Sequence, residues 1–262
     1  MNNYRPLVFA HRGGAEALPE HTLGAYLRSL EEGADGLECD VRLTRDGHLV
    51  CVHDSRLNRT SNGRGRVSRK TLAELDSLDF GSWHPGYPAE EPLPELSRLL
   101  TLDHLLEAMR GCGRQVRLLI ETKHPTRYGA EVERKLAWTL RRHGLAESKP
   151  DDAVQVTVMS FAAIALRRVR ARTPAVPTVY LLEILPPGVG RGRLPFGARI
   201  AGPGVALLRS RPGLVQAIRA AGNQCYVWTV NDDADLDLVL EHQVDGVITD
   251  RPRFVLDRLS RM

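Results

Sequence analysis

Seven ionisable side chains in the first half of the chain lie in or directly after short apolar segments that read as strands. They come from four successive segments and include imidazole, guanidinium, carboxylate and ammonium groups. In chain order they are His11, Arg12, Glu38, Asp40, His53, Glu121 and Lys123. Because parallel strands of an α/β fold place functional groups at their carboxyl ends, we expect these side chains to converge at one mouth.

The three carboxylates in this set favour a metal site. Glu38 and Asp40 are two residues apart, so in a strand they point the same way, and Glu121 ends the next parallel segment. Carboxylates that converge cannot all stay ionised unless a cation compensates, and oxygen ligands suit Mg²⁺, Mn²⁺ or Ca²⁺ better than zinc. We expect one hard divalent cation. In the alternative interpretation, each carboxylate is half-exposed and is paired with a basic side chain such as Arg12, Arg42 or Lys123.

The two histidines are suited to proton transfer near neutral pH, with one imidazole accepting a proton while the other donates one. A single histidine at a strand end is more often a hydrogen-bonded structural residue. Here His11 and His53 accompany three carboxylates, and Arg12 and Lys123 supply the positive charge that phosphate oxygens require. The combination favours chemistry at a phosphoryl centre.

The elements that must position these groups alternate between strand and helix patterns, as in repeated βα units around a parallel sheet. Nine runs qualify as strands: Leu7–Ala10, Gly36–Leu43, Leu49–His53, Val116–Glu121, Val154–Val158, Thr178–Leu182, Val205–Leu208, Gln224–Thr229 and Gly246–Ile248. We therefore expect a (β/α)₈ TIM barrel as a single domain over residues 1–262, with one of the nine candidates outside the barrel.

Several segments between these runs have apolar residues at helical spacing. They contain Leu23, Tyr26, Leu27 and Leu30; Leu102, Leu105, Leu106 and Met109; Val132, Leu136 and Leu140; and Leu214, Val215 and Ile218. Helices that cover the outside of a barrel have this pattern.

Two places break the alternation. Residues 44–48 are too few for a crossover helix and contain Asp46-Gly47, which predicts that the chain reverses in a tight turn. Residues 55–94 are polar and much longer than an ordinary βα loop, so we expect an insertion that forms a small subdomain over the barrel mouth.

Composition limits the partners and the cellular location. The 36 basic residues are set against 32 acidic ones, which does not favour nucleic-acid binding. The basic clusters 64–70 and 167–172 are typical of solvated faces, although they could attract a phosphate-bearing substrate or a membrane surface. The chain starts without a secretory signal pattern, its four cysteines are scattered, and no apolar run reaches the roughly 18 residues of a membrane helix. We expect a cytoplasmic protein with reduced thiols and no stable membrane insertion.

Eight short motifs together resemble the glycerophosphodiester phosphodiesterase family, a phosphodiesterase barrel of the phospholipase-C-like type. The family opens with His-Arg-Gly, Pro-Glu-Asn-Thr, Glu-x-Asp-Val and His-Asp, and here HRGG, PEHT, ECDV and VHD stand in that order. The later matches are IETK at 120–123, SF at 160–161, VWTVN at 227–231 and VDGVITDRP at 244–252. The ordered set spans nearly the whole chain.

The resemblance implies a role for each site residue. It makes Glu38, Asp40 and Glu121 the metal ligands, His11 and His53 the acid and base, and Arg12 and Lys123 the phosphate-binding pair. It implies that Glu20 lies at the first loop as a further site or supporting group. Trp228 would face the glycerol, or else would only fill the barrel core. His21 stands where the family usually has Asn, which leaves the role of this loop open.

The expected reaction is metal-dependent hydrolysis of an sn-glycerol-3-phosphodiester, a small molecule, to an alcohol and sn-glycerol 3-phosphate, through attack by water or by the neighbouring glycerol hydroxyl. One alternative is a lysophospholipase D-type enzyme, which would need an apolar groove, for example within 181–196, although that segment reads as a loop. A second alternative is a catalytically inactive glycerophosphodiester-binding protein. The head group, the preferred cation and the oligomeric state stay open.

Overall fold

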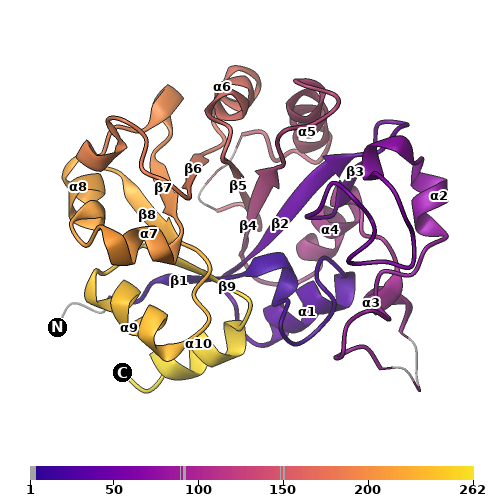
Figure 1. The fold of residues 1–262 in the computed structure, drawn as a ribbon, viewed down its shortest axis with the longest axis horizontal. Helices are drawn as coiled ribbons and strands as arrows, with labels where there is room; N and C mark the ends of the chain where they lie inside the picture. Colours follow the sequence, from indigo (N-terminus) through magenta and orange to yellow (C-terminus); the bar gives the residue numbers. More distant parts are fainter. Residues whose placement is uncertain (1–3, 89, 91–92, 148, 150) are drawn as a thin grey trace.

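Eight parallel strands close into a barrel in the computed structural model, which describes residues 4–88, 90, 93–147, 149 and 151–262 (Figure 1). The barrel strands are β1 (Leu7–Ala10), β2 (Gly36–Leu43), β4 (Val116–Thr122), β5 (Val154–Ser160), β6 (Thr178–Leu182), β7 (Ile200–Pro203), β8 (Gln224–Val227) and β9 (Gly246–Thr249). The pairing of β1 with both β2 and β9 closes the ring. The predicted (β/α)₈ TIM barrel is confirmed.

Helices surround the barrel between successive strands. They are α1 (Leu23–Glu31), α4 (Leu102–Arg110), α5 (Glu131–Arg142), α6 (Ala163–Arg172), α7 (Val205–Ser210), α8 (Leu214–Ala220), α9 (Asp233–Glu241) and α10 (Pro252–Leu259). The apolar face predicted for α1 is confirmed at Tyr26 and Leu30, which are buried, and the Thr22 hydroxyl accepts a hydrogen bond from the Ala25 N–H to cap this helix.

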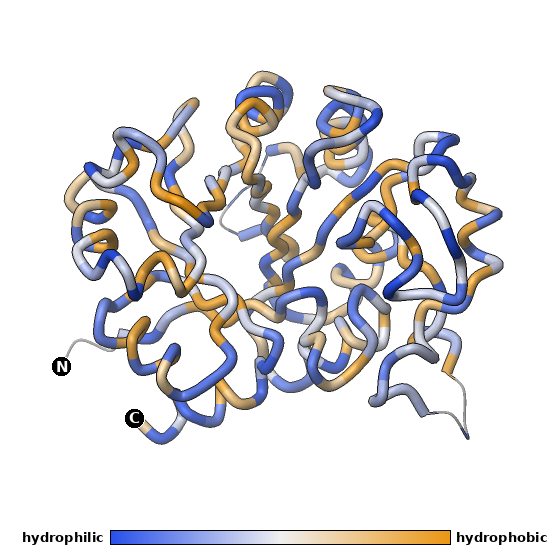
Figure 2. Tube along the Cα trace, viewed as in Figure 1, coloured by the Kyte–Doolittle hydropathy of each residue, from blue (hydrophilic) through white to orange (hydrophobic). Residues whose placement is uncertain are grey.

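The hydrophobic core has an inner and an outer part. Inside the barrel, Phe9, Leu119, Met159 and Ile248 belong to one buried cluster. Two larger clusters fill the space between the strands and the surrounding helices. Figure 2 shows the same division, with hydrophobic segments along the central strands and hydrophilic ones over the outer turns of the helices. The barrel is therefore a packed scaffold that holds its strand ends in fixed positions.

The ninth strand lies outside the barrel. β3 (Leu49–Cys51) runs antiparallel to β2, with Val41 opposite Cys51, so the predicted reversal after Leu43 is confirmed. Reading His53 as the end of a parallel barrel strand was wrong. β2 continues past the mouth, and the chain then turns back along it, so that the Val52 N–H reaches the Asp40 carbonyl at 3.0 Å. His53 arrives at the mouth by this return path.

The prediction of a strand at Val205–Leu208 was also wrong, because these residues form α7 and the strand is Ile200–Pro203. A short apolar run does not by itself separate helix from strand. Pro203 lies at the very end of β7, and Gly202 packs closely on β6, since a Cβ there would lie 2.8 Å from Leu181 Cδ2. Gly202 and Pro203, which precede the predicted strand, are thus part of the observed one.

The insertion after β3 contains the short helices α2 (Leu72–Asp76) and α3 (Pro94–Ser97) and a 3₁₀ turn at Val67–Arg69. It has its own apolar cluster, which includes Leu57, Leu75 and Phe80 and packs on Val50 of β3. Figure 1 shows α2 and α3 at the edge of the molecule next to β3. That this segment is a separate subdomain stays a prediction, and Ala89, Glu91 and Pro92 lie outside the described residues.

The segment considered for a lipid groove is a loop. Between β6 and β7 it contains only the 3₁₀ turns Val189–Arg191 and Pro195–Gly197. Within the described ranges, no helix is both long and apolar enough to cross a membrane.

Candidate active site

Three carboxylates from two neighbouring barrel strands meet inside the mouth. Glu38 and Asp40 point inward from β2, and the register of β2 against β4 places Asp40 beside Glu121. Their exposed fractions are 1%, 1% and 6%, and one oxygen of each lies within 4.8 Å of the others. The predicted convergence agrees with this geometry, whereas the role of these residues as metal ligands stays a prediction.

Two cationic side chains contact this carboxylate cluster. Lys123 Nζ lies 2.9 Å from Glu121 Oε1 and 3.2 Å from Asp40 Oδ1. Arg12 Nε lies 3.3 Å from Asp40 Oδ2, and the Arg12 backbone N–H donates to Glu38 Oε2 at 3.1 Å. Of the three basic partners considered from the sequence, Arg42 differs, because it donates to the backbone carbonyl of His53.

Burial and mutual repulsion raise the pKa values of two of these acids, whereas neighbouring basic side chains lower that of the third. Burial raises the pKa of Glu38 well above its usual range, and Asp40 and Glu121 raise it further. Burial, with repulsion from Asp40, raises the pKa of Glu121 to about 8. Although burial alone would also raise the pKa of Asp40, Lys123, His21 and Arg12 lower it well below the usual range. The pocket therefore holds more carboxylates than its own cations can keep ionised.

The donor set fits a hard divalent cation. Three carboxylates, Glu38, Asp40 and Glu121, are balanced by only two cationic side chains, and all the available ligand atoms are oxygens. Oxygen-rich sites select Mg²⁺, Mn²⁺ or Ca²⁺ over zinc. This acidic triad could hold one such ion.

His11 begins a tight 3₁₀ turn at the carboxyl end of β1. Its Nδ1 lies 2.7 Å from Asp250 Oδ1, and its Nε2 lies 4.0 Å from Glu38 Oε2. Gly13 makes this turn possible, because its φ of +87° is left-handed and a Cβ would lie 3.1 Å from the Ala25 Cβ of α1. Since a carboxylate can only accept, the ring donates through Nδ1, and Nε2 is directed at the carboxylate cluster.

Asp250 is itself held by a partner. Its Oδ2 accepts from Asn231 Nδ2 at 2.7 Å, and its backbone N–H donates to Asn231 Oδ1 at 2.9 Å. Although burial alone would raise the pKa of Asp250, the hydrogen bonds from His11 and Asn231 help to lower it. Asp250 is therefore ionised at neutral pH and fixes the orientation of the His11 ring.

His53 has a similar arrangement, with an aspartate bound to its Nδ1. Its Nδ1 lies 2.7 Å from Asp54 Oδ1, and Arg59 from the insertion binds both Asp54 and Glu20. Hydrogen bonds from Arg59 and His53 lower the pKa of Asp54, and burial lowers the pKa of His53 to about 4. His53 is therefore neutral near pH 7, with a free lone pair on Nε2. Glu20 is buried against Arg59 and supports this side of the mouth.

His21 is a site residue whose role the sequence left open. Its Nε2 lies 3.0 Å from Asp40 Oδ2 and its Nδ1 lies 2.7 Å from the Tyr26 hydroxyl. Burial lowers the pKa of His21, and because a carboxylate can only accept, the ring donates through Nε2 to Asp40. It thus orients Asp40, one of the three clustered carboxylates.

Asp250 and Asn231 are among the supporting residues that the sequence reasoning missed, as are Asp54 and Arg59. Asp250 and Asn231 lie in motifs that were matched as VDGVITDRP and VWTVN, without a role for either residue. Asp250 directly follows β9, so the rule of polar residues at carboxyl ends of strands, extended beyond the first four segments, could have found it.

A cavity of about 170 Å³ joins these groups at the mouth. The polar groups of His11, His53, Glu38 and Glu121 line one part of it, while Phe161, Leu181 and Trp228 form an apolar side next to Glu183. The Trp228 indole N–H donates to the Gly202 carbonyl at 2.7 Å, and its ring meets Phe161 edge to face at 5.4 Å. Trp228 therefore faces the cavity, although its contact with glycerol stays a prediction.

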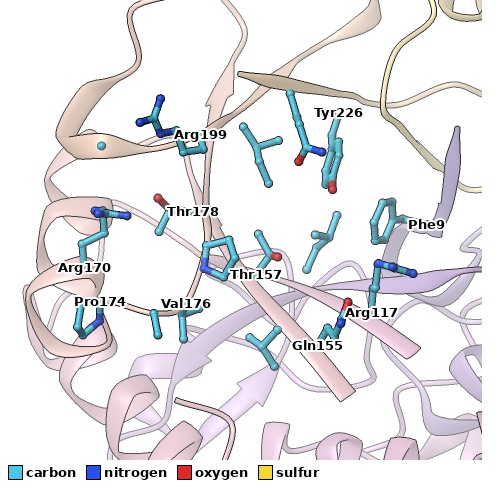
Figure 3. A pocket seen from close by; sticks show the side chains of 17 residues that line it. Phe9, Arg117, Gln155, Thr157, Arg170, Pro174, Val176, Thr178, Arg199 and Tyr226 are labelled. Atoms are coloured by element: carbon cyan, nitrogen blue, oxygen red, sulfur yellow. The ribbon is translucent and has the colours of Figure 1, made fainter. Parts of the chain in front are cut away.

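A larger cavity of about 410 Å³ lies at the opposite end of the barrel (Figure 3). Figure 3 shows Arg170, Arg199 and Thr178 on one side of it and Phe9, Arg117 and Tyr226 on the other. Among the described residues that line it, none carries a carboxylate or an imidazole. The described lining of this cavity therefore offers none of the carboxylates and imidazoles that line the mouth.

Sequence comparison with known proteins points to a single family. Residues 11–254 match the glycerophosphoryl diester phosphodiesterase family. The chain is 45% identical to the probable glycerophosphodiester phosphodiesterase 1 of Mycobacterium tuberculosis, over 94% of this chain and 90% of that one. It is 36% identical to the glycerophosphodiester phosphodiesterase of Bacillus subtilis, over 95% and 84% of the two chains.

Comparison of structures agrees. A phosphodiesterase of Oleispira antarctica, solved in complex with the product sn-glycerol-3-phosphate, superposes with a TM-score of 0.83 at 26% identity, covering 97% of each chain. Together with a barrel mouth that combines buried carboxylates and two oriented histidines, these matches show that the chain belongs to the glycerophosphoryl diester phosphodiesterase family, whose members are phosphoric diester hydrolases.

Proposed function

We propose that this enzyme hydrolyses sn-glycerol-3-phosphodiesters with one divalent cation, releasing an alcohol and sn-glycerol 3-phosphate. The observation that carries the proposal is the position of the Glu38, Asp40 and Glu121 cluster beside the two histidines, each of which is oriented by its own aspartate. The product in the Oleispira relative supports the same assignment.

In this proposal Glu38, Asp40 and Glu121 hold the cation. When bound, it would supply positive charge that polarises the phosphate oxygens and stabilises charge in the transition state. Arg12 and Lys123, at the edge of the carboxylate cluster, would turn their N–H groups to the phosphate oxygens as the cation takes over the carboxylates.

The two histidines divide the proton transfers. His53 is neutral at pH 7 because burial lowers its pKa to about 4, so its Nε2 is suited to accept a proton from the attacking group. The donor role then belongs to His11, which is held by the ionised Asp250. The attacking group is either water or the neighbouring glycerol hydroxyl. Efficient hydrolysis of bis(p-nitrophenyl) phosphate, which has no such hydroxyl, would exclude the hydroxyl route as the only one.

The size of the cavity favours a small substrate over a lysophospholipid. At about 170 Å³, it lies below the range of about 300 to 1,000 Å³ that is typical of drug-sized ligands. Its apolar side, formed by Phe161, Leu181 and Trp228, is suited to the carbon atoms of a glycerol. Higher activity on lysophosphatidylcholine micelles than on glycerophosphocholine would contradict this preference.

The test is the release of sn-glycerol 3-phosphate from glycerophosphocholine by protein freed of metal with a chelator and then titrated with Mg²⁺, Mn²⁺ or Ca²⁺. We expect turnover that depends on the added ion and gives choline as the second product. Turnover that persists in excess chelator would contradict the metal site. Tight binding of the diester without product at any ion concentration would instead indicate a binding protein.

A further inference from the structure

A second groove lies beside the active-site cavity at the mouth of the barrel. It has a volume of about 270 Å³ and is formed by the end of β2, the insertion and the loop after β4. Three arginines from these three segments line it: Arg42, Arg66 and Arg127. In the part of the chain that the structure describes, no acidic side chain is among its lining residues.

The groove and the cavity are separated by very little chain. His53 and Lys123 line the cavity, whereas Ser55 and Pro125 line the groove. Two residues of extended backbone span at most about 7 Å. In both segments, the residue that lines the cavity and the residue that lines the groove are therefore no further apart than that along the chain. A substrate with a short head group can therefore reach both.

Arg42 connects the two spaces. It lies on the same face of β2 as Glu38 and Asp40, one step further along the strand. Its Nε and Nη2 donate to the His53 carbonyl at 2.9 and 2.7 Å. The Arg42 guanidinium therefore lies between the active-site cavity and the groove.

The other two arginines are available to a ligand. Arg66 and Arg127 are exposed, and the ion pairs of the described residues include neither of them, while the Arg127 guanidinium lies 5.8 Å from the centre of the Tyr128 ring. The walls that carry them are tied together, because the Tyr128 hydroxyl donates to the Ser68 carbonyl at 2.6 Å and the Val67 N–H donates to the Ser55 carbonyl at 3.1 Å. The groove is therefore formed before any ligand arrives.

The orientation of the substrate follows from the two sides of the mouth. The apolar side with Phe161 and Trp228 lies over β5 and β8, and the groove lies beyond β2 and β4. If glycerol packs on the apolar side and the phosphate lies between the histidines, the head group that leaves points to the groove.

We propose that the groove of Arg42, Arg66 and Arg127 binds a second anionic group on the head group of the substrate, so that the enzyme prefers glycerophosphodiesters whose head group carries a further phosphate. This inference rests on the proposed function. Guanidinium groups bind phosphate through paired charge-assisted hydrogen bonds, which a neutral head group cannot form.

The test compares two substrates that differ by one phosphate group: glycerophosphoglycerol and the same diester with a terminal phosphate on its head group. We expect the wild-type kcat/KM to be about tenfold higher for the phosphorylated diester, as one additional charged contact would give. The double variant Arg66→Gln, Arg127→Gln should lose this preference and keep its kcat/KM for glycerophosphoglycerol, whose head group is neutral. Arg64→Gln, from the same insertion but outside the groove, is the matched control and should retain the preference.

Two results would overturn the inference. One is equal kcat/KM for the two diesters in the wild-type enzyme, and the other is an equal loss for both diesters in the double variant, which would indicate a general effect on folding or catalysis. Calorimetric binding of the two diesters to His11→Ala, with and without the double substitution, separates this inference from the proposed function. Preferential binding of the phosphorylated diester that disappears with the two arginines would support the groove even if neither diester were hydrolysed, and the absence of any preference would contradict it.

Discussion

The two ends of the barrel differ in the ionisable groups that line their cavities, and the larger cavity is not the one that holds the carboxylates and histidines. The cavity at the amino ends of the strands is the larger, at about 410 Å³, and it is lined by Arg117, Arg170 and Arg199 over an apolar floor. The cavity at the carboxyl ends is only about 170 Å³, yet it contains the buried carboxylates and both oriented histidines. The clustered carboxylates and the oriented histidines lie at the end where burial brings like charges together, and such positions are costly unless a ligand compensates.

The difference has a structural cause. At the carboxyl end, β2 extends beyond the barrel, β3 returns along it, and the insertion adds Arg59, so several segments supply side chains to one small volume. At the amino end, short connections lead into the strands and leave Thr178 and Arg199 at the entrance of β6 and β7. In barrels of this kind the amino end contributes mainly to stability, whereas the loops at the carboxyl end carry the active site.

The largest effect that we expect to distinguish the two ends comes from the histidines. His11→Ala and His53→Ala should each lower kcat by about 10²- to 10⁴-fold, the usual contribution of an acid or base. Arg117→Gln at the opposite cavity should change kcat by less than about twofold. Steady-state rates with a saturating divalent cation provide the measurement, and a comparable loss in Arg117→Gln would remove the distinction.

The aspartate behind His11 should have a smaller effect. Asp250→Asn leaves the His11 ring without an ionised acceptor at Nδ1, and we expect a loss of about 10- to 100-fold in kcat, as for other histidines oriented by carboxylates. The control is Asp257→Asn, whose carboxylate pairs with Arg253 on the surface of α10. If the two variants had equal activity, Asp250 would have no positioning role.

The stability of the metal-free protein should depend on pH through His53. Its pKa in the folded protein is about 4 because burial lowers it, whereas an unfolded histidine titrates near 6.5. Between these values the unfolded chain binds a proton that the folded protein excludes, so the free energy of unfolding falls as pH decreases from about 6.5 to 4. Urea unfolding of wild type and His53→Gln at pH 7 and 4.5 should show a smaller decrease in the variant. An identical decrease would mean that His53 titrates normally in the fold.

The smallest effect concerns the opposite cavity. Thr178 is buried at the start of β6, and its hydroxyl has no hydrogen-bond partner among the described residues. Thr178→Val should therefore stabilise the protein by up to about 1 kcal/mol and leave kcat unchanged, because it removes an unsatisfied polar group without changing the shape. Urea unfolding measures the change, and a clear destabilisation would show that the hydroxyl has a partner such as a water molecule.

Sequence patterns predicted the barrel because hydrophobic periodicity depends only on which face of each segment is buried. They failed where two conformations share one pattern. The apolar run at Val205–Leu208 fits a strand and a short helix equally well, and only the packing of Gly202 against β6 shows that the strand comes earlier.

The site was predictable to the extent that it follows the rule of polar residues at strand ends, which identified the Glu38, Asp40 and Glu121 cluster. Its supporting residues were not, because their partners are distant in sequence. Asp250 is 239 residues from His11, and the hydrogen bond from His21 to Asp40 depends on a loop with a left-handed backbone at His21. Such pairings emerge only from the closed barrel.

The most direct test of the account compares one substitution at each end of the barrel. Glu121→Gln at the mouth and Arg199→Gln at the opposite cavity would be titrated with Mn²⁺ by calorimetry and assayed for sn-glycerol 3-phosphate release from glycerophosphocholine. We predict that Glu121→Gln loses both Mn²⁺ binding and activity, by about a thousandfold or more in kcat/KM, as several kcal/mol of lost charge stabilisation requires. Arg199→Gln should match the wild type in both measurements. Wild-type Mn²⁺ binding and turnover in Glu121→Gln, or their loss in Arg199→Gln, would contradict the assignment of the chemistry to the carboxylate end.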